Sequence, residues 1–135
     1  MNSILDNGYP DILVVGVGKL EGIKVANNNP NSKVVGIDID QEQLTVAKSI
    51  RRKYKVKNLS LVNHDIAGDA LEDSYDYVVA TGVLHNIPDL STALSNIQRC
   101  LRSNGVFSGE VFDEDSENSK DQYSVHYSKD LWRST

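Results

Sequence analysis

Three groups of residues in this chain have the types and spacing of a nucleotide site, and each accompanies a short apolar run. Gly16-Val17-Gly18 can form a tight turn whose free backbone amides would face an anionic or carboxylate group. Asp38 ends the next apolar run, roughly 20 residues on, where a carboxylate can accept hydrogen bonds from two ribose hydroxyls. Residues 75–89 have the pattern of a buried strand, a polar loop and a helix start. Together these strand ends predict a nucleotide pocket better than any one of them alone.

Each of these groups also has a structural interpretation without a ligand. Gly16 and Gly18 would serve equally in a plain strand-to-helix turn, because short glycine motifs often occur by chance. Asp40 is placed to cap the helix that follows it, whereas Asp38 comes too early for that role. The pairing of Asp38 with the glycine turn therefore favours a nucleotide.

Another acid, Asp65, follows the third apolar run in the segment Asn63-His64-Asp65-Ile66. An acid at a strand end can accept a hydrogen bond from an exocyclic amine while its apolar neighbour packs on a ring face. Taken alone, Asp65 is better explained as the cap of an Asx turn, and His64 as a loop histidine. A ligand-binding role for Asp65 is favoured only because the segment follows the other two motifs.

The elements that must position these residues alternate between strands and helices. Short apolar runs predict strands, and the third of them is expected near a sheet edge; they lie at residues 12–16, 34–37, 59–62, 77–80 and 105–112. Amphipathic segments between them predict helices, one capped by Asp40 with Gln43 at capping-box spacing, and one that begins at Pro88 and Asp89 and closes at Asn104-Gly105. A weaker helix is expected over residues 19–28. This alternation predicts an α/β protein with a parallel sheet.

Size and charge narrow the function classes. The chain has 135 residues, which predicts a single domain over residues 1–135, and its formal net charge is −5, which argues against a nucleic-acid partner. The basic run at residues 48–57 is explained by the solvated end of a helix. The single cysteine, Cys100, fits a reducing compartment, and no apolar run approaches a membrane span, so we expect a cytoplasmic protein with no membrane partner. No metal site is expected.

The C-terminal part of the chain does not continue the alternation of strands and helices. Residues 113–122 are acidic and polar and predict a solvated loop, and residues 127–135 resemble the start of a helix with Ser128 as its cap. Five strands would leave the flank of the last one uncovered, and that edge could pair with a partner or a second copy to form a homo-oligomer. The chain is either a fragment or a minimal version of its fold, and the sequence leaves both open.

These residues, taken in order, resemble the motifs of class I S-adenosylmethionine-dependent methyltransferases. The likeness runs from about Pro10 to Phe112, and Gly82-Val83-Leu84-His85 before the Pro-Asp helix start is its most specific part. The other segments that carry it are residues 10–18, 34–38, 61–66 and 97–105. The resemblance implies a Rossmann-like three-layer sandwich with a mainly parallel five-stranded sheet in the order 3-2-1-4-5, lacking the family's usual C-terminal strand pair.

The resemblance also implies a cofactor, S-adenosylmethionine, and a role for each matching residue. The turn at Gly16, Val17 and Gly18 would bind its methionine end, Asp38 with Ile39 its ribose, and Asp65 with Ile66 its adenine. Thr81, Gly82 and Val83 would pass beside the methionine and the sulfonium, with His85 near the acceptor. His85 is a candidate catalytic base, because histidine titrates near neutral pH, but it could equally hold the shape of its loop.

Two positions depart from the family pattern. Val14 stands where the family often has an acid, and Leu20 where it usually has a third glycine. Three hypotheses for the function therefore stay open. The first is methyl transfer to a small-molecule or protein acceptor, an in-line displacement that needs positioning more than a strong base. The second is a non-catalytic binding or interaction module with the same fold, and the third is an NAD-dependent oxidoreductase, since a glycine turn with Asp38 fits that too.

Overall fold

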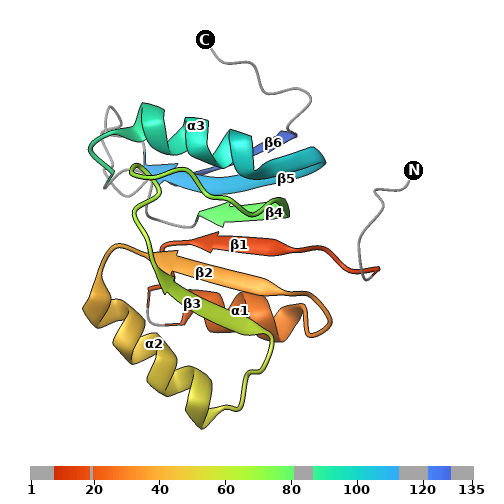
Figure 1. The fold of residues 1–135 in the computed structure, drawn as a ribbon, viewed down its shortest axis with the longest axis vertical. Coiled ribbons are helices and arrows are strands. Elements are labelled where there is room, and N and C mark those ends of the chain that lie inside the picture. Colours follow the sequence, from red (N-terminus) through yellow and green to blue (C-terminus); the bar gives the residue numbers. More distant parts are fainter. Residues whose placement is uncertain (1–7, 19, 81–86, 113–121, 129–135) are drawn as a thin grey trace.

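The structure is a computed structural model that describes residues 8–18, 20–80, 87–112 and 122–128. Its elements, in chain order, are β1 (Ile12–Val15), α1 (Glu21–Asn28), β2 (Val34–Asp38), α2 (Gln41–Lys53), β3 (Leu59–Asn63), β4 (Tyr75–Ala80), α3 (Leu90–Cys100), β5 (Leu101–Phe112) and β6 (Gln122–Ser128). The strands form one sheet in the order β3-β2-β1-β4-β5-β6 (Figure 1). The first five strands are parallel, and β6 runs antiparallel to β5. The predicted α/β sheet and its order are confirmed.

The helices cover both faces of the sheet because its central strand is apolar on both sides. Successive side chains of a strand point to opposite faces. Leu13 and Val15 of β1 belong to the apolar cluster under α3, whereas Ile12 and Val14 belong to the cluster that includes residues of α1. A third cluster joins α2 to the first βα turn. This arrangement is the three-layer sandwich that the resemblance implied.

Two helix starts follow the predicted capping chemistry. The Asp40 side chain accepts hydrogen bonds from the amides of Glu42 at 2.9 Å and Gln43 at 3.4 Å, and α2 begins at the next residue. The Asp89 carboxylate accepts from the Thr92 amide at 3.1 Å at the start of α3. Capping of this kind satisfies amides that have no partner within the helix.

Two predictions for the C-terminal part were wrong. Helix α3 ends at Cys100, not at Asn104-Gly105, because Leu101 already has extended backbone angles (φ −81°, ψ 134°) and starts β5. The predicted loop reached residue 122 and the predicted helix began at residue 127, but Gln122–Ser128 form strand β6, in which Ser128 pairs with Val106. The backbone of β5 thereby gains partners along its whole second half, which removes the uncovered flank expected at residues 105–112. Residues 129–135 lie outside the described residues.

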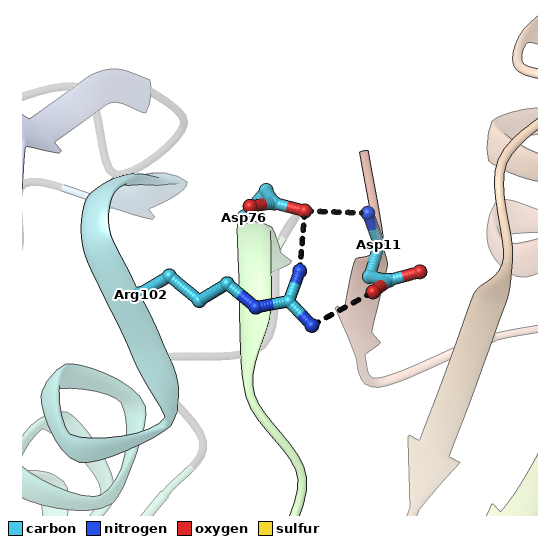
Figure 2. Close-up of polar contacts among 3 residues, drawn as sticks. All are labelled: Asp11, Asp76 and Arg102. Carbon is cyan, nitrogen blue, oxygen red and sulfur yellow. Dashed lines mark hydrogen bonds and ion pairs between the residues drawn. The ribbon is translucent and has the colours of Figure 1, made fainter. Parts of the chain in front are cut away.

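At the amino ends of the central strands, one arginine joins three strands (Figure 2). Arg102, at the start of β5, contacts the Asp76 carboxylate of β4 through Nη1 at 2.7 Å and the Asp11 carboxylate just before β1 through Nη2 at 2.9 Å. The Asp11 amide donates to the same Asp76 oxygen at 2.8 Å. All three side chains are partly buried, so we call this group the arginine clamp.

None of the helices within the described ranges has the length and apolar character needed to span a lipid bilayer.

Candidate functional site

A cavity of about 460 Å³ lies at the opposite end of the sheet, where the parallel strands finish. Its volume is within the usual range for small-ligand pockets. The cavity, called here the strand-end cavity, lies on the β1–β2–β3 side of the point where the strand order reverses between β1 and β4, the usual ligand position in such sheets. Its walls come from the ends of β1, β2 and β3 and from the approach to α3: Val15, Gly16, Ile37, Asp38, Ile39, His64, Asp65, Ile66, Ala67, Ile87, Pro88 and Asp89.

The glycine turn after β1 depends on two backbone conformations and one close contact. Gly16 and Gly18 have φ values of 77° and 53°, which glycine adopts without strain, and the Gly16 amide donates to the Ile37 carbonyl at 2.8 Å. Between them, the Val17 side chain is fully buried against α2. A Cβ at Gly36 would lie 2.4 Å from Val17 Cγ1, so the turn can sit on β2 only because Gly36 has no side chain.

Asp38, at the end of β2, supports the start of the following loop and lines the cavity. Its Oδ1 accepts a hydrogen bond from the Asp40 amide at 2.9 Å, but no amide of α2 donates to it, and Asp40 caps the helix as predicted. Its other carboxylate oxygen accepts no hydrogen bond from any residue that the structure describes, and Asp38 lines the cavity. The neighbouring Ile39 is 69% exposed and also lines the cavity, where it offers apolar surface to a ligand.

Asn63 fixes the backbone behind Asp38. Its Nδ2 donates to the carbonyls of Asp38 at 3.0 Å and Ile39 at 3.1 Å, and the His64 amide donates to the Asp38 carbonyl at 3.1 Å. No role was predicted for Asn63, and its only signal was its place at the start of the segment that carries Asp65.

Asp65 makes the predicted Asx turn and also lines the cavity. Its Oδ1 accepts from the Ala67 amide at 2.9 Å, which makes an Asx turn, and its carbonyl accepts from the Gly68 amide at 2.9 Å. Asp65 also lines the cavity, and Ile66 beside it is 5% exposed and belongs to the cluster beneath α3. His64 bonds the Asp69 carbonyl through Nε2 at 2.9 Å, as expected for a loop histidine, although it lines the cavity as well.

The cavity is acidic. Asp38, Asp65 and Asp89 line it, and none of the lining residues in the described part of the chain is a lysine or arginine. The Thr92 hydroxyl, with the Thr92 amide, donates to Asp89 and holds the pKa of that carboxyl below its ordinary value, so Asp89 is charged at neutral pH. Such a wall suits a ligand with positive charge or hydroxyl and amine donors, and it disfavours one with several negative charges.

The structure therefore brings five of the predicted cofactor-binding residues to one cavity: Gly16, Asp38, Ile39, Asp65 and Ile66. Val17 and Gly18 lie in the adjoining turn but not in its wall, and the Val17 side chain points into the core. Thr81, Gly82, Val83 and the candidate base His85 lie outside the described residues. Their roles stay predictions.

Val14 and Leu20, the two departures from the family pattern, both lie outside the cavity wall. Val14 is fully buried in the cluster shared with α1, where a carboxylate would have no partner in that cluster. Leu20 is 47% exposed at the start of α1 and does not line the cavity. Neither side chain occupies ligand space in the cavity.

Comparison with known proteins adds a family and several relatives. Residues 12–133 match the family model of a methyltransferase domain. Demethylmenaquinone methyltransferase of Staphylococcus aureus (strain JH9) is 35% identical over 78 residues, which cover 57% of this chain and 32% of that enzyme. The enzyme of the same name from Oceanobacillus iheyensis is 32% identical, again over 78 residues, with coverage of 54% and 31%. The chain thus spans about a third of the length of the curated relatives it matches.

Solved structures share the fold at lower identity. Coclaurine N-methyltransferase, solved with N-methylheliamine and SAH, has a TM-score of 0.69 and 18% identity, with coverage of 79% of this chain and 32% of that one. The cyclase SpnF has a TM-score of 0.70 and 22% identity, with coverage of 78% and 39%. The fold is therefore common to proteins named for different reactions.

Proposed function

The chain belongs to the methyltransferase domain family, and from that premise we propose that it binds S-adenosylmethionine in the strand-end cavity and transfers its methyl group to an acceptor. The observation that carries the proposal is the meeting of Gly16, Asp38 and Asp65 in one cavity, from three strand ends far apart in the sequence. These are the residues to which the family resemblance assigned the methionine, ribose and adenine parts of the cofactor.

The residues fit that cofactor chemically. Asp38 and Asp65 each use one carboxylate oxygen on a backbone amide and keep the other for a ligand, which suits ribose hydroxyls and an exocyclic amine. The exposed side chain of Ile39 adds apolar surface for a flat ring. The bound cofactor would supply an electrophilic methyl group on a sulfonium, and the acidic wall favours such a positive charge.

The oxidoreductase hypothesis fits the cavity less well. A nicotinamide dinucleotide carries a pyrophosphate, and three carboxylates without a lysine or arginine among the described lining residues would oppose its binding. The non-catalytic module remains the second candidate, because a shared fold and a cofactor site do not by themselves establish methyl transfer. That candidate differs from the first in methyl transfer and not in cofactor binding.

For the acceptor, we propose a small molecule ahead of a protein, since the two curated relatives described above are named for demethylmenaquinone. The net charge of −5 makes nucleic acid a poor acceptor. The chain's single cysteine, the buried Cys100, is in keeping with a reducing compartment such as the cytoplasm.

The test is calorimetric titration of S-adenosylmethionine, S-adenosylhomocysteine and NAD into the parent and two Asp38 variants. We expect the parent to bind both adenosyl ligands and not NAD. Asp38→Ala should weaken binding at least about tenfold, the equivalent of one charged hydrogen bond. Asp38→Asn should also weaken binding while it keeps an acceptor for the Asp40 amide, which separates ligand contact from support of the turn.

Asp73→Asn is the matched control, because Asp73 is exposed and lies outside the cavity wall. Equal binding by the parent and Asp38→Ala would show that the cavity is wrongly assigned. Transfer of a labelled methyl group from S-adenosylmethionine to any member of a panel of small phenols, quinols and amines would exclude the non-catalytic module.

A further inference from the structure

Helix α3 buries one polar side chain on its otherwise apolar face. Asn96 is 5% exposed and lies among Ala93, Ile97 and Cys100, which all pack into the core. A buried amide is costly unless it is hydrogen-bonded. The Nδ2 of Asn96 donates to the carbonyls of Ile66 at 2.7 Å and Gly68 at 3.2 Å, so both contacts go to one turn about 30 residues away in the chain.

That turn is the part of the cavity wall that carries Asp65. From within, it is closed by the bonds of the Ala67 and Gly68 amides to Asp65. From outside, the bonds that the structure gives to its Ile66 and Gly68 carbonyls come from Asn96. Since the Ile66 carbonyl belongs to the residue directly after Asp65, the amide of Asn96 fixes the backbone from which the Asp65 carboxylate projects.

We propose that Asn96 is a positioning residue that aims the free oxygen of Asp65 at the exocyclic amine of adenine, and so determines selectivity for adenosyl ligands. The inference rests on the proposed function. A hydrogen bond weakens steeply as its angle departs from linearity. A tilted turn would therefore weaken the bond between Asp65 and the amine, while the rest of the cavity still binds the rest of the ligand. Asn96 itself touches no ligand in this proposal and acts through Asp65.

A second asparagine provides a matched control. Asn58 Nδ2 donates to the carbonyls of Ala26, Asn29 and Ser32, at 3.1, 2.9 and 3.0 Å, and holds the end of α1 at the other end of the sheet. It makes the same kind of bond as Asn96, but no residue of this group lines the cavity. Asn58→Leu therefore reports the loss of a structural amide alone.

The experiment measures the affinities of S-adenosylhomocysteine and S-inosylhomocysteine, which differ in the exocyclic amine, by calorimetry. The parent should prefer the adenosyl ligand about tenfold, as one good hydrogen bond would give. Asn96→Leu, with similar volume and no donor, should reduce that ratio to about twofold or less. Asn58→Leu should keep the parent's ratio. In an Asp65→Asn background, the amide oxygen can still accept from the Ala67 amide, and an NH2 donor replaces the oxygen that would face the amine, so Asn96→Leu should leave the ratio unchanged.

The outcomes separate the two proposals. A parent that binds neither ligand overturns the proposed function and this inference with it. A parent that binds both ligands equally, or a folded Asn96→Leu that keeps the full ratio, overturns the inference alone, as does an equal loss in Asn58→Leu. If Asn96→Leu fails to fold, Asn96→Ser keeps one donor in a smaller side chain and should lower the ratio about threefold, and an unchanged ratio in that variant overturns the inference.

Discussion

The two ends of this sheet use aspartate in opposite ways. At the amino ends of the strands, Asp11 and Asp76 share the guanidinium of Arg102, and both carboxylates are partly buried. At the carboxyl ends, Asp38 and Asp65 have no cationic partner among the described residues and bond only to backbone amides of their own turns. The first pattern satisfies charge within the protein, and the second leaves one oxygen of each acid without a hydrogen bond from the described residues. The same residue type thus forms ion pairs at one end of the sheet and, in the proposed function, contacts the cofactor at the other.

Removal of the arginine clamp should have the largest effect, and only on stability. Arg102→Ala leaves Asp11 and Asp76 close together without their cation, so we expect the free energy of unfolding to fall by about 3 kcal/mol. Urea unfolding measures this change, and the affinity for S-adenosylhomocysteine in the folded variant should stay within about twofold of the parent's. Arg102→Lys, which keeps the charge but not the two-pronged geometry, should lose less. A tenfold loss of affinity would refute the independence of the two ends.

A change that should affect both stability and binding lies between the ends, at Gly36. Its Cβ would lie 2.4 Å from Val17 Cγ1, so Gly36→Ala must push the glycine turn away from β2. Overpacking of this kind should cost about 2 kcal/mol and weaken ligand binding several-fold. Gly22→Ala is the control, because its Cβ would meet the same Val17 atom at an ordinary 3.5 Å. If Gly36→Ala matches the control in urea unfolding and calorimetry, the turn does not depend on this contact.

The amino end should also have a distinctive response to alkali. Burial, with a smaller contribution from Asp73, raises the pKa of Tyr75 to about 12. A tyrosine whose pKa is higher in the folded state stabilises the fold fully below pH 10, and that contribution is lost as the pH rises toward 12. Between neutral pH and about pH 10.5, the free energy of unfolding of the parent should therefore fall by about 1 kcal/mol more than that of Tyr75→Phe. Urea unfolding at the two pH values measures this difference. Parallel pH profiles of the two proteins would contradict this.

The smallest effect is expected at the position where the family usually has a third glycine. Leu20 is 47% exposed and outside the cavity wall, so Leu20→Gly should change the affinity for S-adenosylhomocysteine by no more than about twofold. The control is the same titration of the parent. A gain of tenfold would mean that Leu20 obstructs the methionine end of the cofactor, and the carboxyl end of the sheet would then be only partly prepared for its ligand.

Much of the fold could be predicted because its signals are local. Apolar runs marked the five parallel strands, and Asp40 and Asp89 marked two helix starts through bonds that span only two or three residues. Strand β6 was missed, although Tyr123, Val125 and Tyr127 alternate with polar residues, because that short signal follows a strongly acidic stretch. The cavity motifs Gly16, Asp38 and Asp65 were predictable for the same local reason.

The residues that hold the site in place were not predictable, since their partners are distant in the sequence. Asn63 bonds across 24 and 25 residues, and Asn96 across 28 and 30. An amide side chain is common in loops and on helix surfaces, so its type alone gave no sign of these roles. A polar residue within the apolar stripe of α3 was the only available signal for Asn96.

The arginine clamp also has a consequence for the order of events during synthesis. Arg102 and Asp11 are 91 residues apart in the chain. Because ribosomes add about 5–20 residues per second, Arg102 is synthesised roughly 5 to 20 s after Asp11. Until then, Asp11 and Asp76 carry like charges at the point where β1 and β4 must pair, which opposes that pairing. The nascent chain is therefore expected to complete the centre of its sheet only after the start of β5 has left the exit tunnel.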